Sequence, residues 1–199
     1  MKRFGVLCLF MAVCLGLAGC SVPTQPPQTA VDGTPWSEDW ETVGGAIGVE
    51  TPEAFTLLQN SDTIAANQMA YAAWSMCEEE PYTTKDDEET TLYDAHLYIL
   101  LARTESSGKA AETLAEWMGI GEGMYVLESN TQERYGGQDF TVITYSYSSE
   151  ENPYSAGASA FCTFANYAVS VEITCRGEAA DDPKALLVEF LQHLHYAGE

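Results

Sequence analysis

The segment 167–175 alternates strictly between apolar and polar residues. Its two sets are Val169, Val171, Ile173 and Cys175 on one side and Ser170, Glu172 and Thr174 on the other. Because successive side chains of a β-strand point to opposite faces of its sheet, this period of two predicts a strand with one buried face. Residues 156–164 predict its hairpin partner, with Ala165 and Asn166 forming the turn.

The register of this hairpin predicts a place for a helix to dock. If Phe164 pairs with Tyr167, small residues lie opposite branched ones; the pairs are Cys162 with Val169, Ala160 with Val171, and Ala158 with Ile173. Such a surface forms a shallow groove. The same register places Cys175 opposite Ala156, too far along the sheet from Cys162 for a disulfide.

Further strand patterns occur in the segments 54–59, 67–77, 92–104, 124–135 and 138–148. The last two flank Gly136 and Gly137, which accept the positive φ angles of a tight hairpin. The run 92–104 is almost continuously apolar, so we expect a central strand that is covered on both faces. Residues 78–90 are rich in acids and predict a solvated loop.

Apolar residues recur at helical spacing in the segments 36–48, 106–118 and 182–196. The expected buried stripes are Trp40, Val43 and Ile47 in the first; Ala111, Leu114, Ala115, Trp117 and Met118 in the second; and Leu186, Leu187, Phe190, Leu191 and Leu194 in the third. Ser37 and Asp182 are predicted N-caps, and Pro183 suits a first helical position.

This order of elements predicts an α+β domain built on a mainly antiparallel sheet of six to seven strands that is covered by helices. It resembles the α/β/α sandwiches of the Mog1/PsbP-like superfamily over most of residues 36–196. The resemblance lies in element order and not in a motif, so it implies a fold and transfers no functional residue. We expect one globular domain over residues 35–199.

The N-terminus carries an export pattern. Lys2 and Arg3 precede an apolar run of about fourteen residues, which is too short to span a bilayer and is typical of a secretory signal peptide. Leu17-Ala18-Gly19-Cys20 resembles the lipobox of bacterial lipoproteins. That resemblance implies that residues 1–19 are removed, and that Cys20 becomes the N-terminus and carries a covalent diacylglycerol.

Such a lipid would hold the chain on the membrane by its acyl chains, palmitate among them, and would place it on the extracytoplasmic face of the cell membrane. The alternative is an ordinary signal peptide with a coincidental cysteine. Residues 20–34 comprise Cys20 and a proline-rich stretch with almost no large apolar residue, which predicts an extended tether.

Charge excludes one class of partner. The chain contains 30 acidic and 8 basic residues, a net charge of −22, and loss of Lys2 and Arg3 with the signal peptide brings it to −24. Nucleic acid is bound by basic side chains that meet its phosphates, so we expect no nucleic-acid partner. We interpret the acidic surface as a source of solubility, with recognition of a cationic partner as the alternative.

Candidate chemistry is sparse. Of the cysteines after the lipobox, Cys77, Cys162 and Cys175 show no zinc spacing, and the sequence leaves open whether two of them form a disulfide or all are free. Asp94 and His96 would share a face of a strand, as an oriented base or as two metal ligands, although a structural histidine is the simpler interpretation. His193 and His195 would point apart on a helix. No cofactor is expected, and no residue is assigned as catalytic.

Aromatic residues suggest a recognition surface. Tyr145 and Tyr147 alternate on one strand and Tyr154 follows shortly after, so together they would offer a rigid contact area, with ordinary sheet packing as the alternative. The leading interpretation is a non-enzymatic interaction or assembly module on the membrane, with a protein partner at the cell surface. The alternatives are a surface hydrolase or metal-dependent enzyme that uses Asp94 and His96, and a small ligand-binding lipoprotein.

Overall fold

The computed structural model describes residues 29–61, 64–65, 68–76, 80–83, 89–119, 125–149 and 152–197. The signal segment, the lipobox with Cys20, and Cys77 lie outside these residues, as does the first part of the expected tether.

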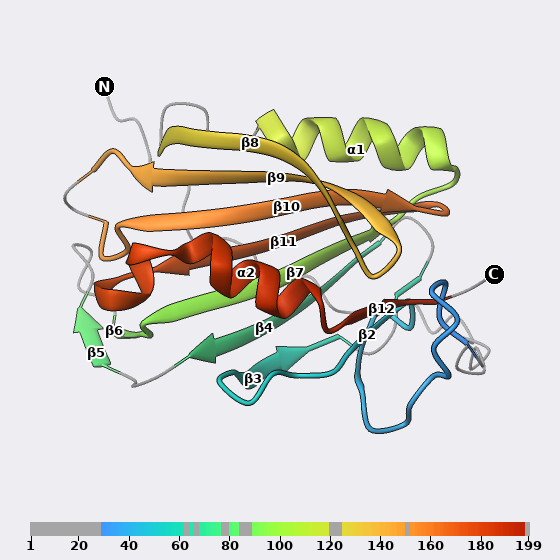
Figure 1. Ribbon diagram of the computed structural model, residues 1–199, viewed down its shortest axis with the longest axis horizontal. Helices are drawn as coiled ribbons and strands as arrows, with labels where there is room; N and C mark the ends of the chain where they lie inside the picture. Colours follow the sequence, from blue (N-terminus) through green and yellow to red (C-terminus); the bar gives the residue numbers. More distant parts are fainter. Residues whose placement is uncertain are drawn as a thin grey trace.

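One large antiparallel sheet organises the domain (Figure 1). Its strands are β3 (Thr56–Asn60), β4 (Met69–Met76), β7 (Ala95–Arg103), β8 (Tyr125–Tyr135), β9 (Gln138–Tyr147), β10 (Ala156–Phe164) and β11 (Tyr167–Cys175). They lie in the order β3-β4-β7-β11-β10-β9-β8. This seven-stranded sheet with helices confirms the α+β class, and β7 takes the internal position expected of the apolar run.

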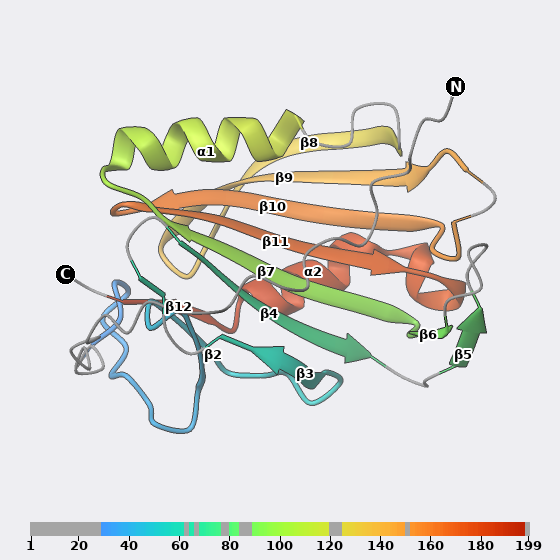
Figure 2. The same cartoon turned by 180° about the vertical axis from the view of Figure 1, so that it is seen from behind.

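Two helices lie on opposite faces of the sheet, as Figures 1 and 2 show from front and back. Helix α2 (Pro183–Leu191) follows the short 3₁₀ segment η1 (Gly177–Asp181) and packs on β10 and β11. Helix α1 (Ser107–Gly119) packs on the same two strands from the other side. We call these two sides of the sheet the α2 face and the α1 face.

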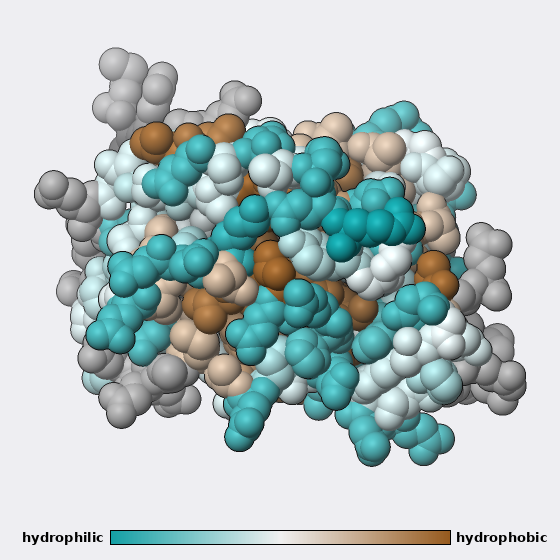
Figure 3. All heavy atoms as spheres, in the orientation of Figure 1, coloured by the Kyte–Doolittle hydropathy of each residue, from teal (hydrophilic) through white to brown (hydrophobic). Residues whose placement is uncertain are grey.

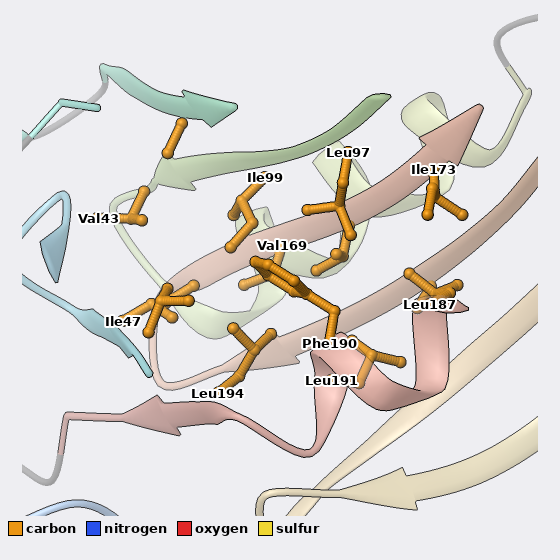
Figure 4. Packing of buried hydrophobic residues seen from close by; sticks show 14 of the residues in the cluster. Val43, Ile47, Leu97, Ile99, Val169, Ile173, Leu187, Phe190, Leu191 and Leu194 are labelled. Atoms are coloured by element: carbon orange, nitrogen blue, oxygen red, sulfur yellow. The ribbon is translucent and has the colours of Figure 1, made fainter. Parts of the chain in front are cut away.

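The predicted groove is present, and α2 occupies it. The register of β10 with β11 pairs Phe164 with Tyr167 and Ala156 with Cys175, as expected from the sequence. Cys162 and Cys175 are free and buried. The main apolar core fills the space between the sheet and α2 (Figure 4), where Leu187, Phe190 and Leu191 are completely buried.

The start of α2 was predicted correctly. Pro183 is its first residue, and the Asp182 side chain accepts a hydrogen bond from the Ala185 backbone N–H at 3.0 Å. The helix ends earlier than predicted, at Leu191. The chain then forms β12 (Leu194–Tyr196), whose backbone is satisfied by pairing with another strand. His193 and His195 are therefore not on a helix.

The helix predicted over residues 36–48 is wrong. The segment forms a hairpin of β1 (Glu41–Val43) and β2 (Ile47–Val49), and β2 also pairs with β12. Gly44 and Gly45 have positive φ angles of 59° and 68°, which a right-handed helix does not contain. They form the turn of this hairpin. Val43 and Ile47 are still buried, now as strand residues that contribute to the core.

Two other expectations are corrected. The acidic segment 78–90 contributes to a small hairpin of β5 (Glu80–Thr83) and β6 (Glu89–Leu92), in which Tyr82, Thr83 and Thr90 are residues that favour strands. Helix α1 is rotated slightly from its predicted stripe. Ala110 is its buried residue and Ala111 is exposed, because the helix rests on Ala102 and Ala168 of the sheet.

The end of the expected tether contacts the domain. Val31 N–H donates to the Tyr196 carbonyl at 2.8 Å, Ala30 bridges to Ala197, and Ala30 is buried. Residues 29–34 thus lie along the C-terminal strand and are not available as spacer.

The outer surface on the α2 side is mostly hydrophilic (Figure 3). Apolar atoms gather at the edge along the start of β8, where Val126 and Leu127 are more than half exposed. None of the helices in the described part of the chain has the length and apolar composition needed to cross a bilayer.

Candidate functional site

Asp94 and His96 have different partners. Asp94 lies just before β7 and forms an ion pair with Arg176, with 3.7 Å between Oδ1 and Nη2. His96 lies in β7, its ring next to those of Tyr93 and Tyr98, and burial lowers its pKa. Within the described ranges, no group of three or more His, Cys, Asp and Glu side chains is placed to hold a metal ion.

The other histidines lie near the N-terminal hairpin. His193 Nδ1 is 3.7 Å from Glu50. The His195 ring stacks on Trp40 with 3.9 Å between ring centroids, and its Nδ1 is 3.5 Å from an Asp32 carboxylate oxygen. His195 therefore helps to hold residues 29–34 against the domain.

Cys162 is an inert thiol. It is 2% exposed on the α2 face, and burial raises its pKa to about 12, so it is protonated at neutral pH. Burial raises the pKa of Cys175 to about 12 as well.

Two of the three tyrosines that were singled out by sequence meet at a cavity. Tyr145 and Tyr147 lie on the α1 face of β9, with ring centroids 5.6 Å apart in an edge-to-face arrangement. Tyr154 lies before β10 and does not line this cavity. A recognition surface that contains all three tyrosines stays a prediction; in the structure, Tyr145 and Tyr147 share the cavity and Tyr154 lies apart from its lining.

The cavity is on the α1 face and has a volume of about 380 Å³. It lies beside α1, which contributes Trp117 to its lining, and Figure 2 shows that this helix covers only part of the sheet. Most of its wall is apolar or aromatic, and its polar side chains come from the middle strands. It is lined by Met69, Tyr98, Leu100, Trp117, Tyr125, Ile143, Tyr145, Tyr147, Ser159, Phe161, Ser170 and Glu172.

A hydrogen-bonded carboxylate lies on the floor of this cavity. The Tyr145 hydroxyl donates to Glu172 Oε1 at 2.8 Å. Tyr98 and Ser159 pair directly with Glu172 from the strands on its two sides, and their hydroxyl groups act to lower the pKa of the carboxyl group. Ser159 Oγ also donates to the Tyr145 hydroxyl at 3.4 Å. Three hydroxyl groups on three strands thus converge on one side chain.

Burial dominates the electrostatics of this group. It raises the pKa of Glu172, while the hydrogen bonds from Tyr98, Tyr145 and Ser159 act in the opposite direction. Burial and the nearby Glu172 charge raise the pKa of Tyr98 and Tyr145 far above the usual value, and that of Tyr147 to about 12. These phenols are therefore neutral hydrogen-bond donors at physiological pH. Among the residues that the structure describes, no lysine, arginine or histidine lines the cavity.

Gly157 provides the space for this arrangement. A Cβ at this position would lie 2.7 Å from the Tyr145 ring and 2.8 Å from the Ile173 carbonyl oxygen. The ring of Tyr145 therefore lies directly over the backbone of β10, which places its hydroxyl group beside Glu172.

Sequence reasoning missed Glu172 as a site residue. The alternation of 167–175 correctly separated Glu172 from the core set, but the polar side of a strand is usually solvated, which gave no reason to expect a site. The missing information is long-range, because Tyr98 reaches Glu172 only through the pairing of β7 with β11, and the two residues are far apart in the sequence.

Comparisons with known proteins carry no argument about the function of this chain. Neither a protein-family model nor a curated protein sequence matches the chain. Solved structures with similar backbones include a crystal structure from Bacteroides thetaiotaomicron VPI-5482, with a TM-score of 0.48, 10% identity and coverage of 80% of this chain. This chain spans 48% of the length of that protein.

Two other similar structures are smaller. The solution structure of cyanobacterial PsbP (CyanoP) from Synechocystis sp. PCC 6803 has a TM-score of 0.45 and 9% identity, covering 90% of this chain and 98% of CyanoP. The crystal structure of LpqN, which is involved in cell envelope biogenesis of Mycobacterium tuberculosis, has a TM-score of 0.45 and 13% identity, covering 76% of this chain and 83% of LpqN.

Proposed function

We propose that this chain is a lipid-anchored extracytoplasmic binding protein, and that the cavity on the α1 face is its binding site for a small molecule. The observation that carries this proposal is the convergence of Tyr98, Tyr145 and Ser159 on Glu172 at the floor of a mostly apolar cavity. Small-molecule sites typically have volumes of about 300 to 1,000 Å³ and apolar walls with a few placed polar groups.

A small ligand suits this surface better than a protein partner does. Protein interfaces of moderate stability are broad, on the order of 800 Å² per partner, whereas the polar groups here are gathered inside a concavity. The alternative of an enzyme that uses Asp94 and His96 receives less support, because Asp94 is paired with Arg176.

The binding proposal is tested with the chain from residue 20 onward carrying Cys20→Ser, so that no lipid is present to take up the probes. Backbone amide NMR shifts are recorded on titration with benzyl alcohol, benzylamine and phenylacetate. We expect at least one probe to shift the amides of cavity residues such as Ser159 and Ser170. If none of the three probes shifts these amides, the binding proposal is wrong.

A cavity-filling variant locates the site. Ser170 is 6% exposed and lines the cavity, so Ser170→Leu should occupy part of its volume and weaken probe binding. The matched control is Ser107→Leu at the exposed start of α1, which should bind as the parent does. NMR spectra establish that both proteins are folded. If Ser170→Leu then binds the probe as tightly as the parent does, the probe binds outside this cavity.

The lipid anchor is supported by the lipobox and is tested separately. Two acyl chains at about 0.8 kcal/mol for each buried methylene hold a protein stably on a membrane. Labelled palmitate should enter the full-length chain and not the Cys20→Ala variant, which should leave the membrane fraction. The neighbouring Ser21→Ala variant should be labelled normally. Labelling that persists in Cys20→Ala would disprove the anchor at this residue.

A further inference from the structure

We infer that the ligand of the α1-face cavity is an organic cation, an ammonium group on an apolar or aromatic body, with Glu172 as its counter-charge. This inference rests on the proposed function, since it specifies the chemistry of the same cavity. Three properties of the described residues support it: an uncompensated carboxylate, walls of aromatic rings, and the lack of any basic side chain in the lining.

Among the described residues that line the cavity, none supplies a positive charge to balance Glu172 when it is ionised. Its hydrogen-bond partners Tyr98, Tyr145 and Ser159 are neutral hydroxyl groups, which stabilise a carboxylate without neutralising it. A partly buried carboxylate gains when a cation enters the same low-dielectric space. The protein as a whole carries a net charge of −22, so the wider field also attracts cations and repels anionic ligands.

The walls suit a cation that is poorly hydrated. Tyr125, Tyr145 and Tyr147 form a row of rings, with centroids 4.6 Å apart between the first two and 5.6 Å apart between the last two, and Trp117 lines the same cavity. Aromatic faces attract ammonium groups through their electron-rich rings, and the attraction grows when water is excluded. A small hydrated ion would gain much less from these walls.

A bare metal ion fits the site less well. Hard cations such as Ca²⁺ take six to eight oxygen ligands, often from several carboxylates, and Glu172 is the only carboxylate that the described part of the chain contributes to the lining. The surrounding phenol groups remain protonated, because the pKa of Tyr98, Tyr145 and Tyr147 is raised. An organic ammonium needs only one counter-charge and apolar surroundings, both of which the cavity offers.

The experiment compares matched probes on the chain from residue 20 onward with Cys20→Ser. Benzylamine and benzyltrimethylammonium are the cations, benzyl alcohol is the neutral probe and phenylacetate is the anion. From typical cation–π and ion-pair strengths, we expect the better cation to bind about tenfold or more tightly than benzyl alcohol. Phenylacetate should bind more weakly than benzyl alcohol. The two cations distinguish a protonated amine from a quaternary ammonium.

Two variants separate the charge from the rings. Glu172→Gln keeps the shape of the side chain, so benzyl alcohol should still bind while the preference for the cation falls to near unity. Tyr147→Leu should weaken cation binding several-fold, whereas Tyr147→Phe, which keeps the ring, should bind as the parent does. NMR spectra of each variant establish that it is folded.

The outcomes distinguish the two proposals. If benzyl alcohol or phenylacetate binds in the cavity as tightly as the cations, the binding site stands and the cation inference is overturned. The same holds if Glu172→Gln retains the full cation preference. If no probe reaches the cavity residues, the proposed function itself fails.

Discussion

The two faces of the seven-stranded sheet differ sharply in chemistry although the same strands build both. On the α2 face, β11 contributes Val169, Val171 and Ile173, which are completely buried in the main core. On the α1 face, the intervening residues of β11 include Ser170 and Glu172, which line a cavity. One face is closed and apolar, and the other is partly open and carries hydrogen-bonding groups.

With the proposed binding site, this difference separates the face that stabilises the domain from the face that would bind a ligand. Helix α2 seals its face with fully buried side chains, whereas the helix on the other face contributes half-buried ones such as Leu114 and Trp117. Burial of apolar area is the main source of stability, so the α2 face should carry most of it. The α1 face can then retain a charged group and an unfilled volume. Substitutions on matched positions of the two faces test this division.

The largest effect is expected for Phe190→Ala. Phe190 is completely buried and packs edge-to-face on Trp74 and Phe55, with ring centroids 4.9 and 5.4 Å apart. Its truncation should lower the free energy of unfolding by about 3 to 5 kcal/mol. Trp117→Ala on α1 should lower it by less, about 1 to 2 kcal/mol, because that side chain is only partly buried. Urea unfolding measures both variants. Equal losses of unfolding free energy would contradict the idea that the α2 face supplies most of the stability.

The next effect is expected for Gly157→Ala. The added methyl group would overlap the Tyr145 ring, so we expect a loss of about 1 to 3 kcal/mol in unfolding free energy and a weaker bond from Tyr145 to Glu172. The control is Gly108→Ala in α1, where the nearest atom to the added Cβ is 3.9 Å away. That change should be neutral or stabilising by up to about 1 kcal/mol. Retained probe binding and stability in Gly157→Ala would show that the ring position is not critical.

The two faces also differ in how far they could be predicted. Local pattern predicted the closed face well, because the period of β11, the hairpin register and the Asp182 cap depend on neighbouring residues. The hairpin over 36–48 was missed, since its apolar spacing suits a helix and only the two adjacent glycines favour a turn. The cavity depends on which strands become neighbours, and no local signal encodes the pairing of Tyr98 with Glu172.

A smaller effect concerns the contact that ties β8 to α2. Glu133 accepts from Lys184 Nζ at 2.6 Å, and hydrogen bonds from Lys184, Thr131 and Tyr135 lower its pKa from 4.5 to about 2. A lowered pKa in the folded state adds stability above about pH 4.5, and this stability is lost as the pH falls toward 2. Both side chains keep solvent contact, which limits the contribution to about 1 kcal/mol.

Glu133→Gln should therefore be less stable than the parent at pH 6, and the difference should vanish near pH 2 to 3. The control is Glu128→Gln, which changes an exposed residue on the same strand. Its unfolding free energy should follow that of the parent over the same range of pH. Chemical unfolding at a series of pH values provides the measurement. A difference that persists unchanged at pH 2 would show that the ion pair is not its origin.

The smallest effect, and the opposite sign, is expected on the α1 face. Burial raises the pKa of Glu172, so its stabilising contribution is complete below the pKa of the unfolded chain and is lost as the pH rises through the higher folded value. Glu172→Gln has no such proton linkage. The unfolding free energy of the variant relative to the parent should thus increase from pH 4 to pH 7, by less than about 1 kcal/mol.

The measurement is the change of this difference with pH. Its absolute value also contains the hydrogen bonds that the amide of the variant makes, which contribute equally at every pH. A slope of the reverse sign would mean that the three hydroxyl donors outweigh burial. Suppose that Glu172→Gln gains stability relative to the parent toward neutral pH and also loses its preference for the cation. The α1 face would then retain this carboxylate for binding although it lowers the stability of the domain, and the α2 face would supply the stability that compensates for it.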